Sequence, residues 1–172
     1  MATATLITPE EYLATTYHPD CDYVDGVIEE RNVGQKDHSG LQSSLPIWFW
    51  TRRKTLRLRA FVEQRVRVGS RRYRIPDVCV VPSPGPDEQV FSQPPYIVIE
   101  ILSPDDGWPK LQERLDDYLA FGVPNIWVLD PTSRRAWRIT REGHLEALDG
   151  ILRADDGRVI LPVAELFTLD ED

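Results

Sequence analysis

The sequence predicts an α/β fold in which helices flank a mixed β-sheet. Residues 96–102 and 125–130 have the composition of apolar strands, and residues 109–121 between them carry apolar side chains at helical spacing. Two strands joined by a helix of this kind lie parallel. Asp25-Gly26 separates two further strand-like runs and indicates a hairpin, which adds antiparallel pairing. The length of 172 residues suits one domain, which we expect to span residues 1–172.

The first expected element is a helix that starts at Thr8. Thr8 can cap it, Pro9 suits its first position, and Glu11 completes a capping box. The helix should end near Thr16. The hairpin follows over residues 21–30 and turns at the Asp-Gly pair.

A second helix is expected from Asp37 or Ser39 toward Lys54. Pro46 should kink it or delay its start. Alternating side chains then predict one strand over residues 60–68. The remaining expected elements are a strand over 73–81, a loop over 82–95, a hairpin over 134–148 and a C-terminal segment, 159–167, that packs back on the domain.

Composition excludes several classes of protein. Hydrophobic residues make up 41% and charged residues 28%, which are ordinary values for a globular chain. No apolar run approaches the roughly 18 residues that a membrane helix needs, so no membrane partner is expected. The first residues have neither the basic nor the apolar region of a secretory signal, and we expect a cytoplasmic protein. Cys21 and Cys79 lie in strand-like segments and are interpreted as buried thiols.

Charge is distributed unevenly along the chain. The net charge is −8, yet residues 52–74 contain ten Lys or Arg and one acid, Glu63. A basic stripe on an acidic body can form a face that contacts phosphates. The sequence equally allows a solvated basic segment that pairs with acidic neighbours.

Two acids stand in apolar strand segments, where an ionised carboxylate is costly unless it is paired, protonated or bound to a cation. Glu100 lies between Ile99 and Ile101, and Asp77 follows Pro76, which lacks a backbone donor and marks a strand edge or bulge. Carboxylates on neighbouring strands form an oxygen-rich site that suits Mg2+ or Mn2+. The residues alone leave open a second interpretation, in which both acids form salt bridges with buried arginines.

The wider pattern resembles a known family. Ile-Pro-Asp at 75–77, Ile-Glu-Ile-Leu-Ser-Pro at 99–104 and the run 114–130 are similar to the Uma-type endonuclease-like family, a branch of the PD-(D/E)XK restriction-endonuclease-like superfamily. The stretch 23–34 and His38 also resemble it. The resemblance covers nearly the whole chain and implies a restriction-endonuclease-like core.

The resemblance implies that Asp77 and Glu100 hold a metal ion, Mg2+ or Mn2+, that activates water against a phosphodiester. A lysine normally completes such a site. In the plain superfamily motif it lies two residues after the glutamate, where this chain has Leu102, and in the family it lies at the position of Arg114. Arginine keeps the charge but cannot act as a base. Lys110, four residues earlier on the same helical face, is the other candidate cation.

Two secondary candidates accompany this set. Glu30 matches an acid typical of the family and could extend the metal shell. His38 either lines the site or caps its helix. Asp105 and Asp106 are expected to be loop and cap residues.

The leading hypothesis is a Mg2+-dependent endonuclease that hydrolyses phosphodiester bonds of DNA. The alternative is a nuclease fold of weakened catalysis that binds nucleic acid or a protein partner. A third hypothesis is a structural module with a buried network of acids and arginines. The resemblance also implies a homodimer, since such nucleases often cut two strands with two copies.

Overall fold

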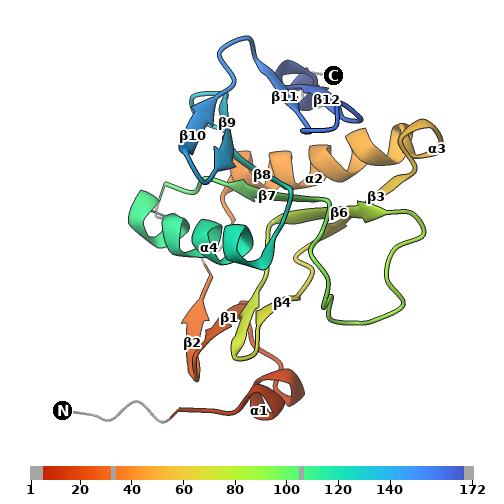
Figure 1. Cartoon of the computed structure of the whole chain (residues 1–172). Coiled ribbons are helices and arrows are strands. Elements are labelled where there is room, and N and C mark those ends of the chain that lie inside the picture. The colour runs from red at the N-terminus through yellow and green to blue at the C-terminus, as the bar shows by residue number, and fades with distance from the viewer. Residues whose placement is uncertain (1–5, 32–33, 105–106, 169–172) are drawn as a thin grey trace.

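The computed structural model describes residues 6–31, 34–104 and 107–168. The elements follow one another as drawn in Figure 1. They are α1 (Pro9–Ala14), β1 (Cys21–Val24), β2 (Val27–Glu30), α2 (Lys36–Thr51), α3 (Arg53–Leu56), β3 (Leu58–Val62), β4 (Val66–Gly69), β5 (Arg72–Arg74), β6 (Val78–Pro82), β7 (Ile97–Ile101), α4 (Trp108–Phe121), β8 (Asn125–Asp130), β9 (Arg135–Thr140), β10 (Gly143–Glu146), β11 (Ile151–Arg153), β12 (Ile160–Pro162) and η1 (Val163–Leu166).

The larger sheet has six strands in the order β10-β9-β8-β7-β6-β3. β7 and β8 run parallel, joined through α4, and the other neighbours are antiparallel. α4 ends at Gly122, whose φ of 91° lies in the left-handed region that glycine adopts without a steric penalty. The predicted strand–helix–strand unit and the mixed sheet are therefore confirmed.

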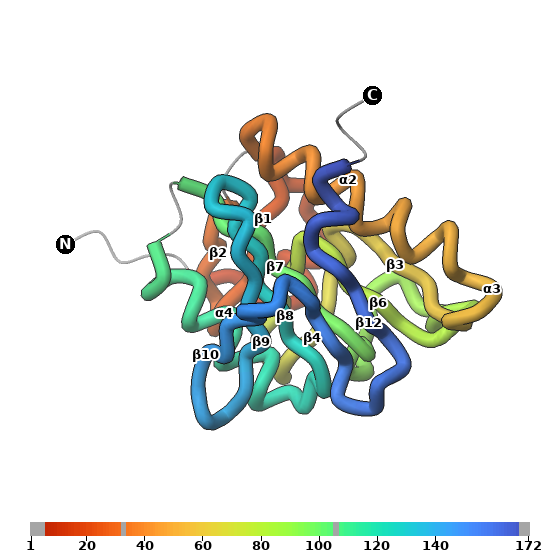
Figure 2. Tube along the Cα trace, turned by 90° about the horizontal axis from the view of Figure 1, so that it is seen from above, coloured from red at the N-terminus to blue at the C-terminus, as the bar shows by residue number. Residues whose placement is uncertain are grey.

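Helices cover both faces of this sheet, with α2 on one side and α4 on the other (Figures 1 and 2). Because side chains alternate along a strand, β7 serves both cores. Ile97, Ile99 and Ile101 pack in the core that contains Leu45 and Phe49 of α2. The core on the opposite face contains Val98 and Val128 from the strands, and Leu111, Leu115 and Tyr118 from α4.

The smaller sheet has the strand order β2-β1-β5-β4 and packs with α1. The capping box predicted at Thr8 and Glu11 is present at the start of α1. Tyr12, Tyr23 and Tyr73 form the buried cluster between α1 and the sheet. The β1–β2 hairpin turns at Asp25-Gly26 as predicted, with φ of 51° and 99°.

The C-terminal segment packs against the core under α2, as expected. Leu152, Leu161 and Leu166 belong to that core, and β11 and β12 form a two-stranded sheet of their own. The predicted hairpin over 134–148 is also confirmed, as β9 pairs with β10.

Two predicted strands are wrong in extent, because each divides into a strand of the larger sheet and a strand of the smaller one. The strand expected over 60–68 divides into β3 and β4, and Glu63 between them has a φ of 49° that no regular strand contains. The strand expected over 73–81 divides into β5 and β6 around Pro76, which cannot donate to a ladder. The chain therefore passes between the two sheets twice within about twenty residues.

The second helix starts before the predicted caps. Gln35 is the N-cap of α2, so Asp37 and Ser39 lie inside its first turns. The helix runs through Pro46, which lacks the donor for one bond of the helical ladder, and ends at Thr51. The periodic apolar face of α2 outweighs the local cap signals, since burial of that face contributes more free energy than a single cap.

Both cysteines are free and buried, which confirms their interpretation as buried thiols. Within the part of the chain that the structure describes, no helix has the length and apolar character needed to cross a membrane.

Candidate functional site

Asp77 and Glu100 lie opposite each other near the point where the chain passes from the smaller sheet to the larger one. β6 and β7 pair antiparallel with Val78 opposite Ile99, and continuing this register by one residue brings Asp77 opposite Glu100. Opposed residues on antiparallel strands present their side chains on the same face. Glu100 is 0% exposed and Asp77 is 3% exposed. The structure therefore brings the two acids together inside the protein.

Asp77 is held by three groups. Nη2 of Arg31 donates to its Oδ1 at 2.6 Å, and the backbone amide of Ile101 donates to its Oδ2 at 2.7 Å. Nε2 of His38 lies 3.4 Å from Oδ2. Burial raises the pKa of Asp77, but the charge of Arg31 and the hydrogen bond with His38 outweigh burial and hold that pKa well below its ordinary value. Asp77 is therefore ionised at neutral pH.

Glu100 is held by two side chains of α4. The hydroxyl of Tyr118 donates to Oε1 at 2.7 Å, and Nη2 of Arg114 lies 3.4 Å from Oε2. Burial raises the pKa of Glu100 to about 7, and the negative charge of Asp77 adds to the rise, although Arg114 opposes it. The two carboxyl groups thus differ in acidity and can take different protonation states near pH 7.

A cleft of about 330 Å3 reaches Asp77, and we refer to it as the Asp77 cleft. Arg31, His38, Asp20 and Glu63 lie among its lining residues. A larger hollow of about 610 Å3 lies between the C-terminal half of α2 and β3, but it is lined mainly by apolar residues and no acid borders it. The Asp77 cleft therefore gives access to one of the two paired acids.

Comparison with known proteins assigns the family. The model of the family described as "Uma2: Putative restriction endonuclease" matches residues 9–169. The chain belongs to the Uma2 family. A solved structure from Anabaena variabilis, described as "a putative nuclease belonging to DUF820", is similar with 24% sequence identity, a TM-score of 0.79, and coverage of 94% of this chain and 98% of that chain. That likeness shows the fold, and the comparison with curated proteins gave no match.

The two candidate cations of this Uma2-family chain differ in their contacts. Arg114 is buried, 5% exposed, and its guanidinium lies beside Glu100. Lys110 is exposed, and its Nζ donates to the backbone carbonyl of Glu30 at 3.3 Å. Leu102 packs with the core under α4, so an apolar group fills the position two residues after Glu100.

The two secondary candidates, His38 and Glu30, differ in their positions relative to Asp77. His38 lies in the Asp77 cleft, and its buried Nδ1 has no hydrogen-bond partner among the described residues. Burial lowers the pKa of His38, but the hydrogen bond with Asp77 and the charge of Asp77 outweigh burial and raise it. Glu30 has an exposed side chain at the end of β2. Asp105 and Asp106 lie outside the described residues.

The sequence analysis did not identify Arg31 or Tyr118 as partners of the two acids. Both contact the paired acids directly. Tyr118 could have been found, since it lies four residues after Arg114 and so on the same helical face. Arg31 carries no local signal that separates it from the many other arginines.

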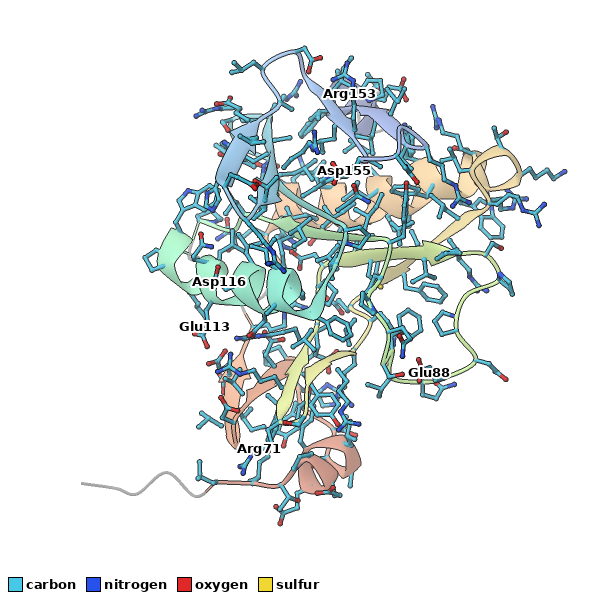
Figure 3. The ribbon with its side chains drawn as sticks, in the orientation of Figure 1. Arg71, Glu88, Glu113, Asp116, Arg153 and Asp155 are labelled. Carbon is cyan, nitrogen blue, oxygen red and sulfur yellow. The ribbon has the colours of Figure 1, made fainter. Side chains whose placement is uncertain are left out.

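A second ionic cluster joins the smaller sheet to α4. Arg74 is 1% exposed, and its guanidinium donates to Asp22 at 3.0 Å, to Glu29 at 2.8 Å, to Asp117 at 2.7 Å and to Glu113 at 3.3 Å. Figure 3 shows Glu113 leaving α4 toward the smaller sheet. This Arg74 cluster fixes the helix that carries Arg114 and Tyr118.

The basic run of residues 52–74 is partly neutralised in the fold. Arg72 pairs with Asp25 at 2.7 Å and with Asp117 at 2.8 Å, and Arg52 pairs with Glu165 at 2.8 Å. Its exposed members are Lys54, Arg57, Arg59, Arg67 and Arg71. Part of the run therefore pairs with acidic neighbours, and the exposed part stays available to contact phosphates.

Proposed function

We propose that this protein is a Mg2+-dependent endonuclease that hydrolyses phosphodiester bonds of DNA at Asp77 and Glu100. One observation carries the proposal: the two buried acids oppose each other in the β6–β7 register, in a chain of the family described as "Putative restriction endonuclease". Nucleic acid as the partner follows from that family description. A homodimer that cuts both strands remains a prediction.

The donor set fits a magnesium ion in its chemistry. Mg2+ prefers oxygen ligands and is commonly held by one or two carboxylates, with water and substrate phosphate in the other positions. Asp77 and Glu100, which oppose each other in the extended β6–β7 register, would supply the acidic ligands. A bound ion would supply a water of lowered pKa and stabilise charge on the phosphate.

The other side chains of the site have separate tasks. Tyr118 and Arg114 fix the orientation of the Glu100 carboxylate, and the Ile101 amide fixes that of Asp77. Arg114 is better placed than Lys110 to neutralise charge near the acids, since its guanidinium already lies beside Glu100. It cannot remove a proton from water, because arginine stays protonated.

Plasmid nicking by the purified protein tests this function. We expect nicking with Mg2+ or Mn2+, its loss in Asp77→Asn and Glu100→Gln, and its loss on addition of EDTA. Arg153→Met is a matched control, since Arg153 is exposed and pairs only locally with Asp149. Equal nicking by the wild type and Glu100→Gln would remove the proposed site.

A second candidate function is binding of nucleic acid without cleavage. It is favoured by the contacts of Arg31 and Arg114, which place a guanidinium on each acid. It predicts DNA binding that weakens steeply with salt, and weakens further in Arg57→Glu/Arg59→Glu, with no nicking in either metal. Absence of binding at low salt would count against this candidate.

A further inference from the structure

Arg31 donates to one oxygen of Asp77, and other groups approach the second. The Ile101 amide already donates to Oδ2, at 2.7 Å, and His38 approaches the same atom. Nη2 of Arg31 donates to Oδ1 at 2.6 Å, and the Arg31 side chain is 12% exposed. Oδ2 thus has two neutral or weakly basic donors near it, while the guanidinium of Arg31 holds Oδ1.

A guanidinium and a divalent ion compete for this oxygen, because both are cations. Magnesium binds carboxylate oxygens at about 2.0–2.1 Å, and its charge would repel a guanidinium that stays within hydrogen-bond distance of the same atom. The attraction between Arg31 and Asp77 is strong in this setting, because both groups are largely removed from water. Binding of a metal at Oδ1 is therefore opposed by Arg31, which holds the same oxygen.

The Asp77 cleft contains other carboxylates that Arg31 could contact. Asp20 and Glu63 line the same cleft, and the side chain of Arg31 borders it as well. Arg31 follows the last residue of β2, so its backbone is not committed to the ladder of that strand. A guanidinium displaced from Asp77 can therefore find another carboxylate without entering the core.

We propose that Arg31 is a built-in counter-ion that competes with the metal for Asp77 and so lowers the affinity of the site for the metal. The inference rests on the proposed function, since it assumes that Asp77 is a metal ligand. As a consequence, the site binds the metal more weakly than Asp77 and Glu100 would without Arg31. Arg31 thus regulates loading of the site while the protein stays folded in the absence of metal.

The test is Mn2+ binding, measured by calorimetry and by the loss of the free Mn2+ signal in electron paramagnetic resonance. Arg31→Met should bind Mn2+ about ten- to hundredfold more tightly than the wild type, the range expected for loss of a charged hydrogen bond. Arg53→Met removes one positive charge elsewhere and should leave the affinity unchanged. Arg31→Gln, which keeps a donor without the charge, gives the same comparison if the methionine variant does not fold.

A double-mutant cycle with Asp77→Asn separates this competition from a general charge effect. The gain from Arg31→Met should vanish in Asp77→Asn, because the competition acts through Asp77. Equal affinity of wild type and Arg31→Met, with loss of binding in Asp77→Asn, would overturn the inference and leave the proposed site standing. Absence of Mn2+ binding in both Arg31→Met and Arg31→Gln would overturn the inference together with the metal site itself.

Discussion

Two buried clusters in this protein set arginine against carboxylates, and they differ in whether a cleft reaches the guanidinium. In the Arg74 cluster one guanidinium donates through Nε, Nη1 and Nη2 to four acids. In the site, Arg31 contacts Asp77 and Arg114 contacts Glu100. The first cluster is closed to solvent at its centre, while the second borders a cleft.

This difference in access distinguishes an arginine that anchors two parts of the fold from one that borders a cleft. A guanidinium that pairs with several acids at once would lose several contacts if it moved. We therefore expect the Arg74 cluster to hold the smaller sheet against α4. A guanidinium that borders a cleft, as that of Arg31 does, is accessible to a competing cation. With the proposed competition at Asp77, the same pair of residue types would anchor in one place and exchange in the other.

Loss of the anchor should have the largest effect on stability. Arg74→Met leaves Asp22 and Asp117 without their central cation, and we expect the free energy of unfolding to fall by about 3–5 kcal/mol. Urea denaturation followed by circular dichroism measures this change. Arg153→Met, at an exposed pair, should leave the urea midpoint unchanged. Similar urea midpoints for Arg74→Met and Arg153→Met would show that the Arg74 cluster does not hold the smaller sheet against α4.

Removing a donor from the site should cost less. Tyr118→Phe deletes the hydroxyl that donates to Glu100 at 2.7 Å, and we expect a loss of about 1–3 kcal/mol at pH 8, where Glu100 is ionised. At pH 5, where Glu100 is protonated, the loss should shrink. An equal loss at both pH values would mean that the hydroxyl only packs.

The pH dependence of the free energy of unfolding should reveal the raised pKa of Glu100. Burial raises its pKa from 4.5 to about 7, against the opposing charge of Arg114. Between these pH values the folded state keeps a proton that the unfolded state has lost, so the free energy of unfolding falls as pH rises, by at most about 1.4 kcal/mol per pH unit. Glu100→Gln, measured in EDTA, should flatten this slope, and an unchanged slope would assign it to another group.

The smallest effect concerns thiol labelling. Burial raises the pKa of Cys79 to about 12, and both thiols should be nearly inert to a maleimide in the folded wild type. Cys21 lies in β1 beside Asp22 of the Arg74 cluster, so Arg74→Met should expose Cys21 before Cys79. Simultaneous labelling, read by mass spectrometry, would mean that the two sheets open together.

The sequence predicted the parts of this fold that depend on neighbours along the chain. The capping box at Thr8, the Asp25-Gly26 turn and the α4 periodicity are local signals, and each is found in the structure. The two divided strands were missed because passage from one sheet to the other is decided by tertiary packing. Alternation along 60–68 looks the same whether or not the chain turns at Glu63.

The site shows the same division. Apolar neighbours pointed to Asp77 and Glu100, since a buried acid is conspicuous in sequence. The partner of Asp77 was not foreseeable, because Arg31 lies 46 residues away and approaches only through the fold. Likewise the choice between Lys110 and Arg114 depends on where α4 sits against the sheet, which no spacing along the helix reveals.

The two faces of α4 restrict which changes of length the chain can tolerate. Arg114 and Tyr118 turn toward Glu100 while Glu113 and Asp117 turn toward Arg74, all within two turns of one helix. Inserting or deleting one residue there would rotate everything beyond it by about 100° and break both sets of contacts together. Changes of length should therefore be rejected between residues 110 and 118.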